Sequence, residues 1–309
     1  MTNDQANISL GLIYSLSALL ALLVPVLLYL LLNWRSPKVQ LEIADRSGGQ
    51  LKEERDSAQD KDGSSVLNPA VFRSFSLLKI IDINYNTKIF RFLIPFSKPL
   101  GLPIGRHISV RAEINGTKVI RAYTPTSKPD QRGYFDLMVK AYEFGKLSSY
   151  LHTLKVGDSL EVRGPIGRFK YEKNAHKCIG LIAGGTGLTP CLQVLRCVLE
   201  GPADDLTRFV LYFQNRNERD ILLRDELGAL VAKHPDRVSL TYFLGNSQSE
   251  TFGRAPNEVR GYISAEAVQA QMRPQDCSLV CICGPSGFND AAKKLLEAAG
   301  HSENSIYIW

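Results

Sequence analysis

The chain has 309 residues, which is about two domains by the usual size range. Hydrophobic residues make up 44% and charged residues 22%, so the composition excludes a disordered or collagen-like protein. The net charge is +6, and because the residues before Pro69 carry −2, the rest carries +8. The positive charge of the chain from Pro69 onward favours an acidic partner, an anionic ligand or an anionic membrane surface. The sequence has no arginine-rich tract or helix-turn-helix pattern, so nucleic-acid binding is not predicted.

Six cysteines are too few for a disulfide scaffold, and none of them forms a Cys-x-x-Cys pair. A structural zinc site and a plant-type iron–sulfur cluster are therefore not expected, and no metal ligands are assigned. Sparse cysteines of this kind are typical of a reduced, cytosolic chain.

The first segment, residues 1–35, is predicted to be a membrane anchor. Residues 10–32 carry no charge, and an α-helix of that length spans roughly 34 Å, enough for the hydrocarbon core. A cleaved signal peptide would have a basic start and a shorter apolar run. Arg35 and Lys38 follow the run directly, so the remainder is predicted to be cytoplasmic.

Residues 36–68 are predicted to be a flexible linker, because glycine pairs and mixed charges leave little apolar material to bury. Residues 69–172 then show closely spaced strands: 78–84, 88–94, 107–114, 117–123, 134–142 and 159–163, with a short helix at 147–154. Asn115-Gly116 is a strong hairpin turn signal. This pattern predicts an antiparallel β-barrel.

Residues 173–309 alternate strands and helices, which predicts a parallel sheet wrapped by helices. The predicted strands are 178–183, 209–213, 237–244, 279–283 and 306–309. Helices are predicted from about residue 189, at 220–233, at 264–272 and up to residue 299. In such a sheet a ligand binds at the carboxyl ends of the strands.

Two strand-to-helix loops of this half are rich in glycine. Residues 184–187 read Gly-Gly-Thr-Gly, followed by Thr189 as the expected N-cap and Pro190 as the expected first helical residue. The second loop begins Cys283-Gly284-Pro285. Glycines let a phosphate approach the backbone, and helix starts offer free N–H donors. Two such loops indicate one dinucleotide held across the sheet, although a tight structural turn is an alternative for the first loop.

The β half contains a second set of candidate binding residues. Arg121, Tyr123 and Thr124 combine a guanidinium group, an aromatic ring and a hydroxyl, which suits a ligand with phosphate and a flat ring. Residues 145–148 open the predicted helix there, and Ser148 with the free N–H groups would hold a phosphate. For Cys283 and Cys281 alone, a small buried hydrophobic role is the alternative interpretation.

The order of these motifs resembles the NADH–cytochrome b5 reductases of the ferredoxin–NADP reductase superfamily. The resemblance covers about residues 76–309, and the anchor matches membrane-bound members. It implies a flavin-binding β-barrel, a nicotinamide-nucleotide domain, FAD and NADH as cofactors, and cytochrome b5, an acidic haem protein, as partner. It also implies location at the endoplasmic reticulum or mitochondrial outer membrane. Hydride would pass from NADH to FAD, and electrons would leave singly.

The resemblance also implies roles for individual residues. Arg121 would pair with the FAD pyrophosphate, Tyr123 and Thr124 would contact the ribityl chain and ring, and Thr124, Thr186 and Cys283 would form the catalytic set beside the nicotinamide. The full set of implied cofactor-binding residues is His107, Arg121, Tyr123, Thr124, Lys140, Tyr142, Gly145, Lys146, Leu147, Ser148, Gly184, Gly185, Thr186, Gly187, Pro190, Cys283, Gly284 and Pro285.

Some features depart from the family pattern. The chain ends in Trp309 instead of Phe, and this ring would either stack on the flavin or close the sheet. After the third parallel strand the family typically has an acidic residue, whereas this segment reads Leu244-Gly245-Asn246, with Arg216 and Arg219 nearby, so NADPH is not excluded. Another acceptor, such as a quinone or a different haem protein, and a non-catalytic FAD/NAD sensor remain alternative functions.

Overall fold

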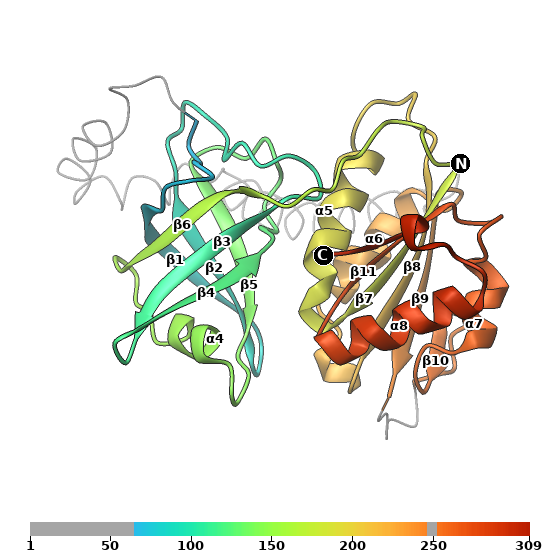
Figure 1. Ribbon diagram of the computed structural model, residues 1–309. Helices are drawn as coiled ribbons and strands as arrows, with labels where there is room; N and C mark the ends of the chain where they lie inside the picture. The colour runs from blue at the N-terminus through green and yellow to red at the C-terminus, as the bar shows by residue number, and fades with distance from the viewer. Residues whose placement is uncertain (1–64, 246–251) are drawn as a thin grey trace, which may run out of the picture. The chain divides into compact units, whose positions relative to one another are not determined.

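The computed structural model describes residues 65–245 and 252–309. They belong to one compact unit and form two six-stranded sheets, one antiparallel and one parallel (Figure 1). The predicted anchor and most of the predicted linker lie outside these residues. No helix in the described part of the chain is long and apolar enough to cross a membrane.

The first sheet has the order β4-β3-β6-β1-β2-β5, and every neighbouring pair is antiparallel. Its strands are β1 (Arg73–Asn84), β2 (Thr87–Leu93), β3 (His107–Ile114), β4 (Thr117–Tyr123), β5 (Tyr134–Lys140) and β6 (Ser159–Ile166). One core, which includes Phe90, Phe92 and Phe135, joins all six strands and the short helix α4 (Lys146–Leu151). The predicted antiparallel sheet is confirmed, while no ladder joins β4 to β5 within the described residues.

The hairpin of β3 and β4 has the bounds that the sequence predicts. Asn115 and Gly116 both have positive φ, 50° and 72°. Two consecutive residues of this kind match the right-handed twist of the flanking strands. The turn therefore sets the register, in which Ile114 pairs with Thr117 and Ile108 with Tyr123.

The second sheet has the order β10-β9-β8-β7-β11-β12, with all pairs parallel. Its strands are β7 (Cys178–Gly184), β8 (Arg208–Asn215), β9 (Val238–Leu244), β10 (Glu258–Arg260), β11 (Leu279–Cys283) and β12 (Ile306–Ile308). The helices are α5 (Leu188–Leu199), α6 (Arg224–Lys233), α7 (Ala265–Gln271) and α8 (Ser286–Ala298), with 3₁₀ turns η1 (Gly185–Gly187), η2 (Glu218–Asp220) and η3 (Glu303–Ser305).

Two apolar clusters cover the two faces of this sheet. Residues of α5 and α6 pack with Leu181 and Phe213 on one face. Residues of α7 and α8 pack with Ile182 and Tyr212 on the other face. Figure 1 shows the same division, with α7 and α8 on one side of the strands and α5 and α6 behind them. Strand β7 is buried along its whole length, which explains its continuous apolar sequence.

Three sequence expectations need correction. Thr189 is not an N-cap and Pro190 is not the first helical residue, because α5 already begins at Leu188, directly after η1. Strand β10 was not predicted, since its three residues are too short for a periodic signal. Val66 and Leu67, which the sequence placed in the linker, are buried in the core of the first sheet.

The terminal Trp309 connects the two sheets. Its indole Nε1 donates to the carbonyl oxygen of Gly105 at 2.9 Å, and its ring lies 5.4 Å from that of Phe169. The amide of Gly105 donates to Oε1 of Gln193 at 2.8 Å. A Cβ on Gly105 would lie 2.0 Å from Phe169, so this loop accepts only glycine without rearrangement.

We expect the folded body to begin before Pro69. A chain of residues 69–309 loses the burial of Val66 and Leu67, each contributing about 1.5–3 kcal/mol. It also loses the bond from the Gly164 amide to the Asn68 carbonyl oxygen, 3.1 Å long. Its melting temperature should be about 5 °C or more below that of residues 64–309. Thermal unfolding of the two truncated chains measures this difference, and equal melting temperatures would contradict it.

Candidate active site

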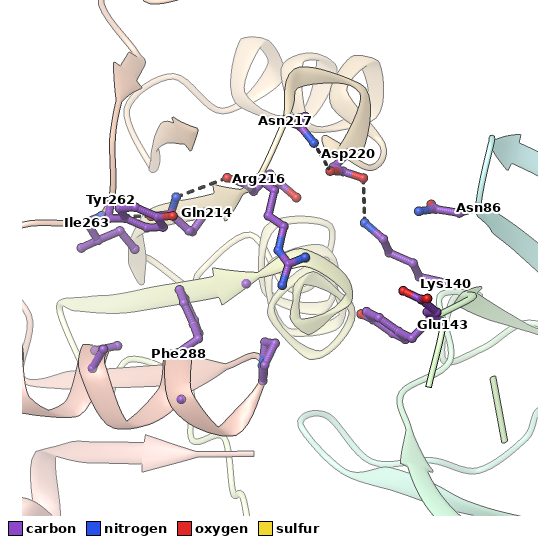
Figure 2. Close-up of a pocket in the computed structure, with 18 of the residues that line it drawn as sticks. Asn86, Lys140, Glu143, Gln214, Arg216, Asn217, Asp220, Tyr262, Ile263 and Phe288 are labelled. Atoms are coloured by element: carbon purple, nitrogen blue, oxygen red, sulfur yellow. Dashed lines mark hydrogen bonds and ion pairs between the residues drawn. The ribbon is translucent and has the colours of Figure 1, made fainter. Parts of the chain in front are cut away.

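A cavity of about 660 Å³ lies at the carboxyl ends of the parallel strands (Figure 2). Both halves of the compact unit line it. The first half contributes residues that follow β1 and end β5, and the second contributes the loops after β7, β8 and β11. The lining residues used below are Tyr85, Lys140, Tyr142, Gly184, Gly185, Asn215, Arg216, Asp220, Tyr262, Pro285 and Gly287.

The two glycine loops touch each other through their backbones. Strands β7 and β11 are parallel neighbours, with Ala183 paired to Cys283, so both loops leave the sheet at the same edge. A Cβ on Gly187 would lie 2.0 Å from the carbonyl oxygen of Cys283. Gly185 has a φ of +55° and open space where a Cβ would be. The first loop is therefore closed against the second at Gly187 and remains open to a ligand at Gly185.

Helices α5 and α8 both begin at this edge. Neither has an acidic residue in its first turn, and neither has a side-chain cap. The Leu188 amide at the start of α5 donates to the carbonyl oxygen of Gly185, and Pro190 has no N–H. The first N–H groups of α8 and the positive dipole ends of both helices are thus available to an anion. This arrangement fits the pyrophosphate of a dinucleotide.

An unpaired amide lies in the same cavity. Asn215 is 5% exposed, and neither its Nδ2 nor its Oδ1 has a hydrogen-bond partner in the described part of the chain. Buried polar atoms without partners are rare. The neighbouring Gln214 is satisfied, because its Oε1 accepts the amide of Ile263 at 2.9 Å. The free donor and acceptor of Asn215 therefore fit a polar ligand such as a nucleotide.

A buried carboxylate joins the two halves beside the cavity. Asp220 Oδ1 accepts Nζ of Lys140 at 2.7 Å and the hydroxyl of Tyr85 at 2.8 Å, and Figure 2 shows Lys140 extending to it. Burial raises the pKa of Asp220, but these two donors outweigh it and hold the pKa below the ordinary value. The ion pair is therefore formed at neutral pH and weakens only in acid.

A second link connects two residues that the sequence analysis singled out separately. The hydroxyl of Tyr142 and Oγ1 of Thr186 lie 3.1 Å apart. Tyr142 follows β5 and Thr186 lies in η1, 44 residues later. The implied flavin residue and the implied nicotinamide residue are thus in direct contact.

Cys283 ends β11, its carbonyl oxygen faces Gly187, and the residue is partly exposed. Burial raises the pKa of its thiol to about 12, so the thiol is neutral at physiological pH. Cys281 is fully buried in the apolar cluster under α5, in agreement with the small hydrophobic role considered for it.

Besides Lys140 and Tyr142, the implied flavin-binding residues of the first half lie on or beside β3, β4 and α4. Burial raises the pKa of Tyr123 to about 12, so its phenol is protonated. The exposed Arg121 donates only to its neighbour's carbonyl oxygen within the described residues, at 2.8 Å. Ser148 Oγ donates to the carbonyl oxygen of Gly145 at 3.0 Å. Burial, with a smaller effect of Arg106, lowers the pKa of His107.

Two of the implied binding residues have side chains that are buried in the protein. Leu147 is 2% exposed and belongs to the core of the first sheet. Pro190 is buried in α5 and has no backbone N–H. Leu147 can take part only through its backbone, and Pro190 is better described as a packing residue.

Tyr85, Asn215 and Asp220 are site residues that the sequence analysis missed. Asn215 ends β8 and Asp220 follows it, and the rule that ligands bind at the carboxyl ends of parallel strands pointed to that segment. Tyr85 carried no comparable signal. It lies in the turn between β1 and β2 and meets Asp220 across 135 residues of sequence.

An aromatic ring covers Gly245, which follows β9. A Cβ on Gly245 would lie 2.6 Å from Cζ of Tyr262, so any side chain there displaces that ring. Arg216 extends into the cavity (Figure 2) and makes no hydrogen bond or ion pair within the described residues. This part of the cavity is therefore cationic.

Comparisons with known proteins agree with this division. Residues 74–171 match the oxidoreductase FAD-binding domain model, and residues 181–294 match the oxidoreductase NAD-binding domain model. The chain is 41% identical to NADH-cytochrome b5 reductase 1 of Dictyostelium discoideum, over 86% of this chain and 89% of the relative. It is 42% identical to the protein of the same name from Mycosarcoma maydis, over 77% and 72%.

Comparison with solved structures indicates the same family. The cytochrome b5 reductase domain of Ulva prolifera nitrate reductase superposes with a TM-score of 0.73 at 34% identity, covering 80% of this chain and all of that one. The CS-b5R domains of human Ncb5or give 0.66 at 29% identity, covering 77% and 69%. With a dinucleotide cavity between an antiparallel and a parallel sheet, this chain belongs to the NADH–cytochrome b5 reductase family of FAD- and NADH-dependent oxidoreductases.

Proposed function

We propose that this protein passes electrons from NADH through FAD to cytochrome b5 while its first segment attaches it to a membrane. The observation that carries the proposal is the cavity lined by both halves, where Tyr142 meets Thr186. When bound, FAD accepts a hydride from NADH and releases the two electrons singly to the acceptor.

The residues of the chain position and screen the reacting groups. Gly184, Gly185, Gly187, Gly284 and Pro285 bring backbone close to the dinucleotide, whose phosphates bind at the starts of α5 and α8.

On the flavin side, Arg121 neutralises the pyrophosphate, Lys146, Leu147 and Ser148 present backbone N–H groups to it, and Gly145 lets the chain approach closely. Tyr123 and Thr124 bind the ribityl chain and ring.

The groups nearest the proposed hydride path are neutral. The Cys283 thiol and the Tyr123 phenol both keep their protons at physiological pH, since burial raises the pKa of each to about 12. Tyr142 and Thr186 add two hydroxyls. Such groups orient a nicotinamide ring without adding a charge, and the chain needs no strong acid or base there.

The acceptor and the membrane are proposed from charge and hydropathy. The residues from Pro69 onward carry +8, which suits an acidic haem protein. The apolar run of residues 10–32 suits a membrane anchor with the body on the cytoplasmic side, at the endoplasmic reticulum or mitochondrial outer membrane. The names of the relatives support cytochrome b5 as the acceptor.

Anaerobic stopped-flow measurements on the purified protein test the proposal. NADH should reduce the flavin, and cytochrome b5 should then be reduced faster than a quinone. Flavin that stays oxidised would favour the sensor alternative, and faster reduction of a quinone would favour another acceptor.

The same measurement with NADPH as the donor tests the nucleotide preference. Flavin reduction should be faster with NADH than with NADPH, and Arg216→Ala should widen this difference in rate if Arg216 attracts a 2′-phosphate.

Flavin retention depends on Arg121 in this proposal. A charge-assisted hydrogen bond contributes about 1.5–3 kcal/mol, so Arg121→Ala should weaken FAD binding roughly ten- to a hundredfold. The measurement is the flavin-to-protein ratio after dialysis. Lys118→Ala is a matched control, because Lys118 is an exposed cation on the same strand. Full flavin retention in Arg121→Ala would overturn the assignment.

Cys283 is proposed to orient the nicotinamide ring. Cys283→Ala should slow flavin reduction by NADH at least several-fold, since small displacements of reacting groups cost large factors in rate. FAD content and melting temperature should stay nearly unchanged. The ratio between the unmodified protein's rate and the variant's rate should be constant from pH 6 to 9, because the Cys283 thiol stays neutral in this range.

Cys281→Ala is the matched control on the same strand. Cys281 is fully buried, so this change should lower the melting temperature and leave the rate of flavin reduction near normal. If both variants behave alike in single-turnover flavin reduction, Cys283 has no catalytic role.

A further inference from the structure

Two cysteines lie side by side at the end of the parallel sheet opposite the active site. Cys178 is the first residue of β7, and Cys277 lies two residues before β11. Their sulfur atoms are 3.0 Å apart although 99 positions separate them in the sequence. Both are free thiols, and both are buried, at 5% and 0% exposure.

The parallel pairing of β7 with β11 brings these thiols together. Ile179 pairs with Leu279. Cys178 and Cys277, which come shortly before these two residues, therefore lie at the same end of the sheet. Cys277 Sγ also lies 3.6 Å from the carbonyl oxygen of Gln271. The cluster around the pair is otherwise apolar and includes Met272 and Val280. The packing thus keeps both sulfurs near each other.

A second cavity, of about 410 Å³, gives access to Cys178. It is lined by Cys178 and by the basic side chains of Lys177, Arg208 and Arg237, with Asp236 and Asp276 also present. Lys177 and Arg208 are exposed. Cys178 thus lines a cavity that also has basic residues in its lining, and nearby cations favour a thiolate.

We propose that Cys178 and Cys277 are a redox-active dithiol that a hydroperoxide oxidises to a disulfide. Cys178 is the attacking residue, because it lines the cavity and Cys277 does not. The hydrogen bond from Cys277 lowers the pKa of Cys178 against the opposing effect of burial, with Arg208 adding to the decrease. The same contact raises the pKa of Cys277, which keeps its proton as the second thiol.

The reaction balances as two thiols plus one hydroperoxide giving one disulfide, one alcohol and one water. The Cys178 thiolate attacks the peroxide oxygen, the O–O bond breaks, and the leaving alkoxide takes a proton. The resulting sulfenic acid on Cys178 is then attacked by the sulfur of Cys277. The S–O bond breaks, the S–S bond forms, and water leaves with the thiol proton.

This disulfide would tie the start of β7 to the segment before β11. It would enclose residues 178–277, which contain four of the six parallel strands, and would lie at the end of the sheet opposite the dinucleotide loops. Cross-linking a loop of this length restricts the unfolded chain, so the oxidised protein should melt about 5 °C or more above the reduced protein.

Peroxide treatment of the full-length purified protein tests the inference. Free thiols counted in denaturant should fall from six to four and return to six with dithiothreitol. Trypsin leaves Cys178 in one peptide with Cys191 and Cys277 in another with Cys281 and Cys283. Fragmentation of the linked peptides should therefore place the bond between Cys178 and Cys277.

Single variants assign the two roles. Cys178→Ser and Cys277→Ser should each abolish the linked peptide, and Cys277→Ser should accumulate a dimedone adduct on Cys178. Cys191→Ser and Cys281→Ser are buried-thiol controls and should still form the link. Six thiols after peroxide, a bond between another pair, or loss of the link in either control would overturn the proposal.

Discussion

The contact between Gly187 and the carbonyl oxygen of Cys283 is the constraint on which the active site depends. A side chain on residue 187 would begin 2.0 Å from that oxygen, so the two strand-to-helix loops can approach only as backbone. Because β7 and β11 are parallel neighbours, both loops, both helix starts and Cys283 then share one edge. A single dinucleotide can therefore reach all of them at once.

The other half of the site is joined to this edge by polar links between distant parts of the chain. Asp220 receives Lys140 and Tyr85, and Tyr142 meets Thr186. The Lys140–Asp220 pair is largely buried, with Asp220 only 4% exposed on its side chain, so removing one partner leaves a costly unpaired charge. These links set how the flavin-binding and nucleotide-binding residues face each other.

The terminal tryptophan has a role in the same arrangement. Of the two possibilities considered for Trp309, stacking on the flavin or closing the sheet, its contacts are those of packing. Its ring lies against Phe169 and its indole donates to Gly105, which Gln193 also binds. Trp309 thereby connects the last strand to the loop before β3.

Local patterns determined much of this protein. The Asn115-Gly116 turn specified its hairpin, the buried run of β7 specified a parallel strand, and the ordered motifs indicated the family, because each depends on neighbours in sequence. Only the tertiary structure decided that Tyr85 and Asp220 meet, that Val66 and Leu67 are core residues, and that Cys178 touches Cys277. These contacts join segments up to 135 residues apart, and strand order, not local periodicity, brings them together.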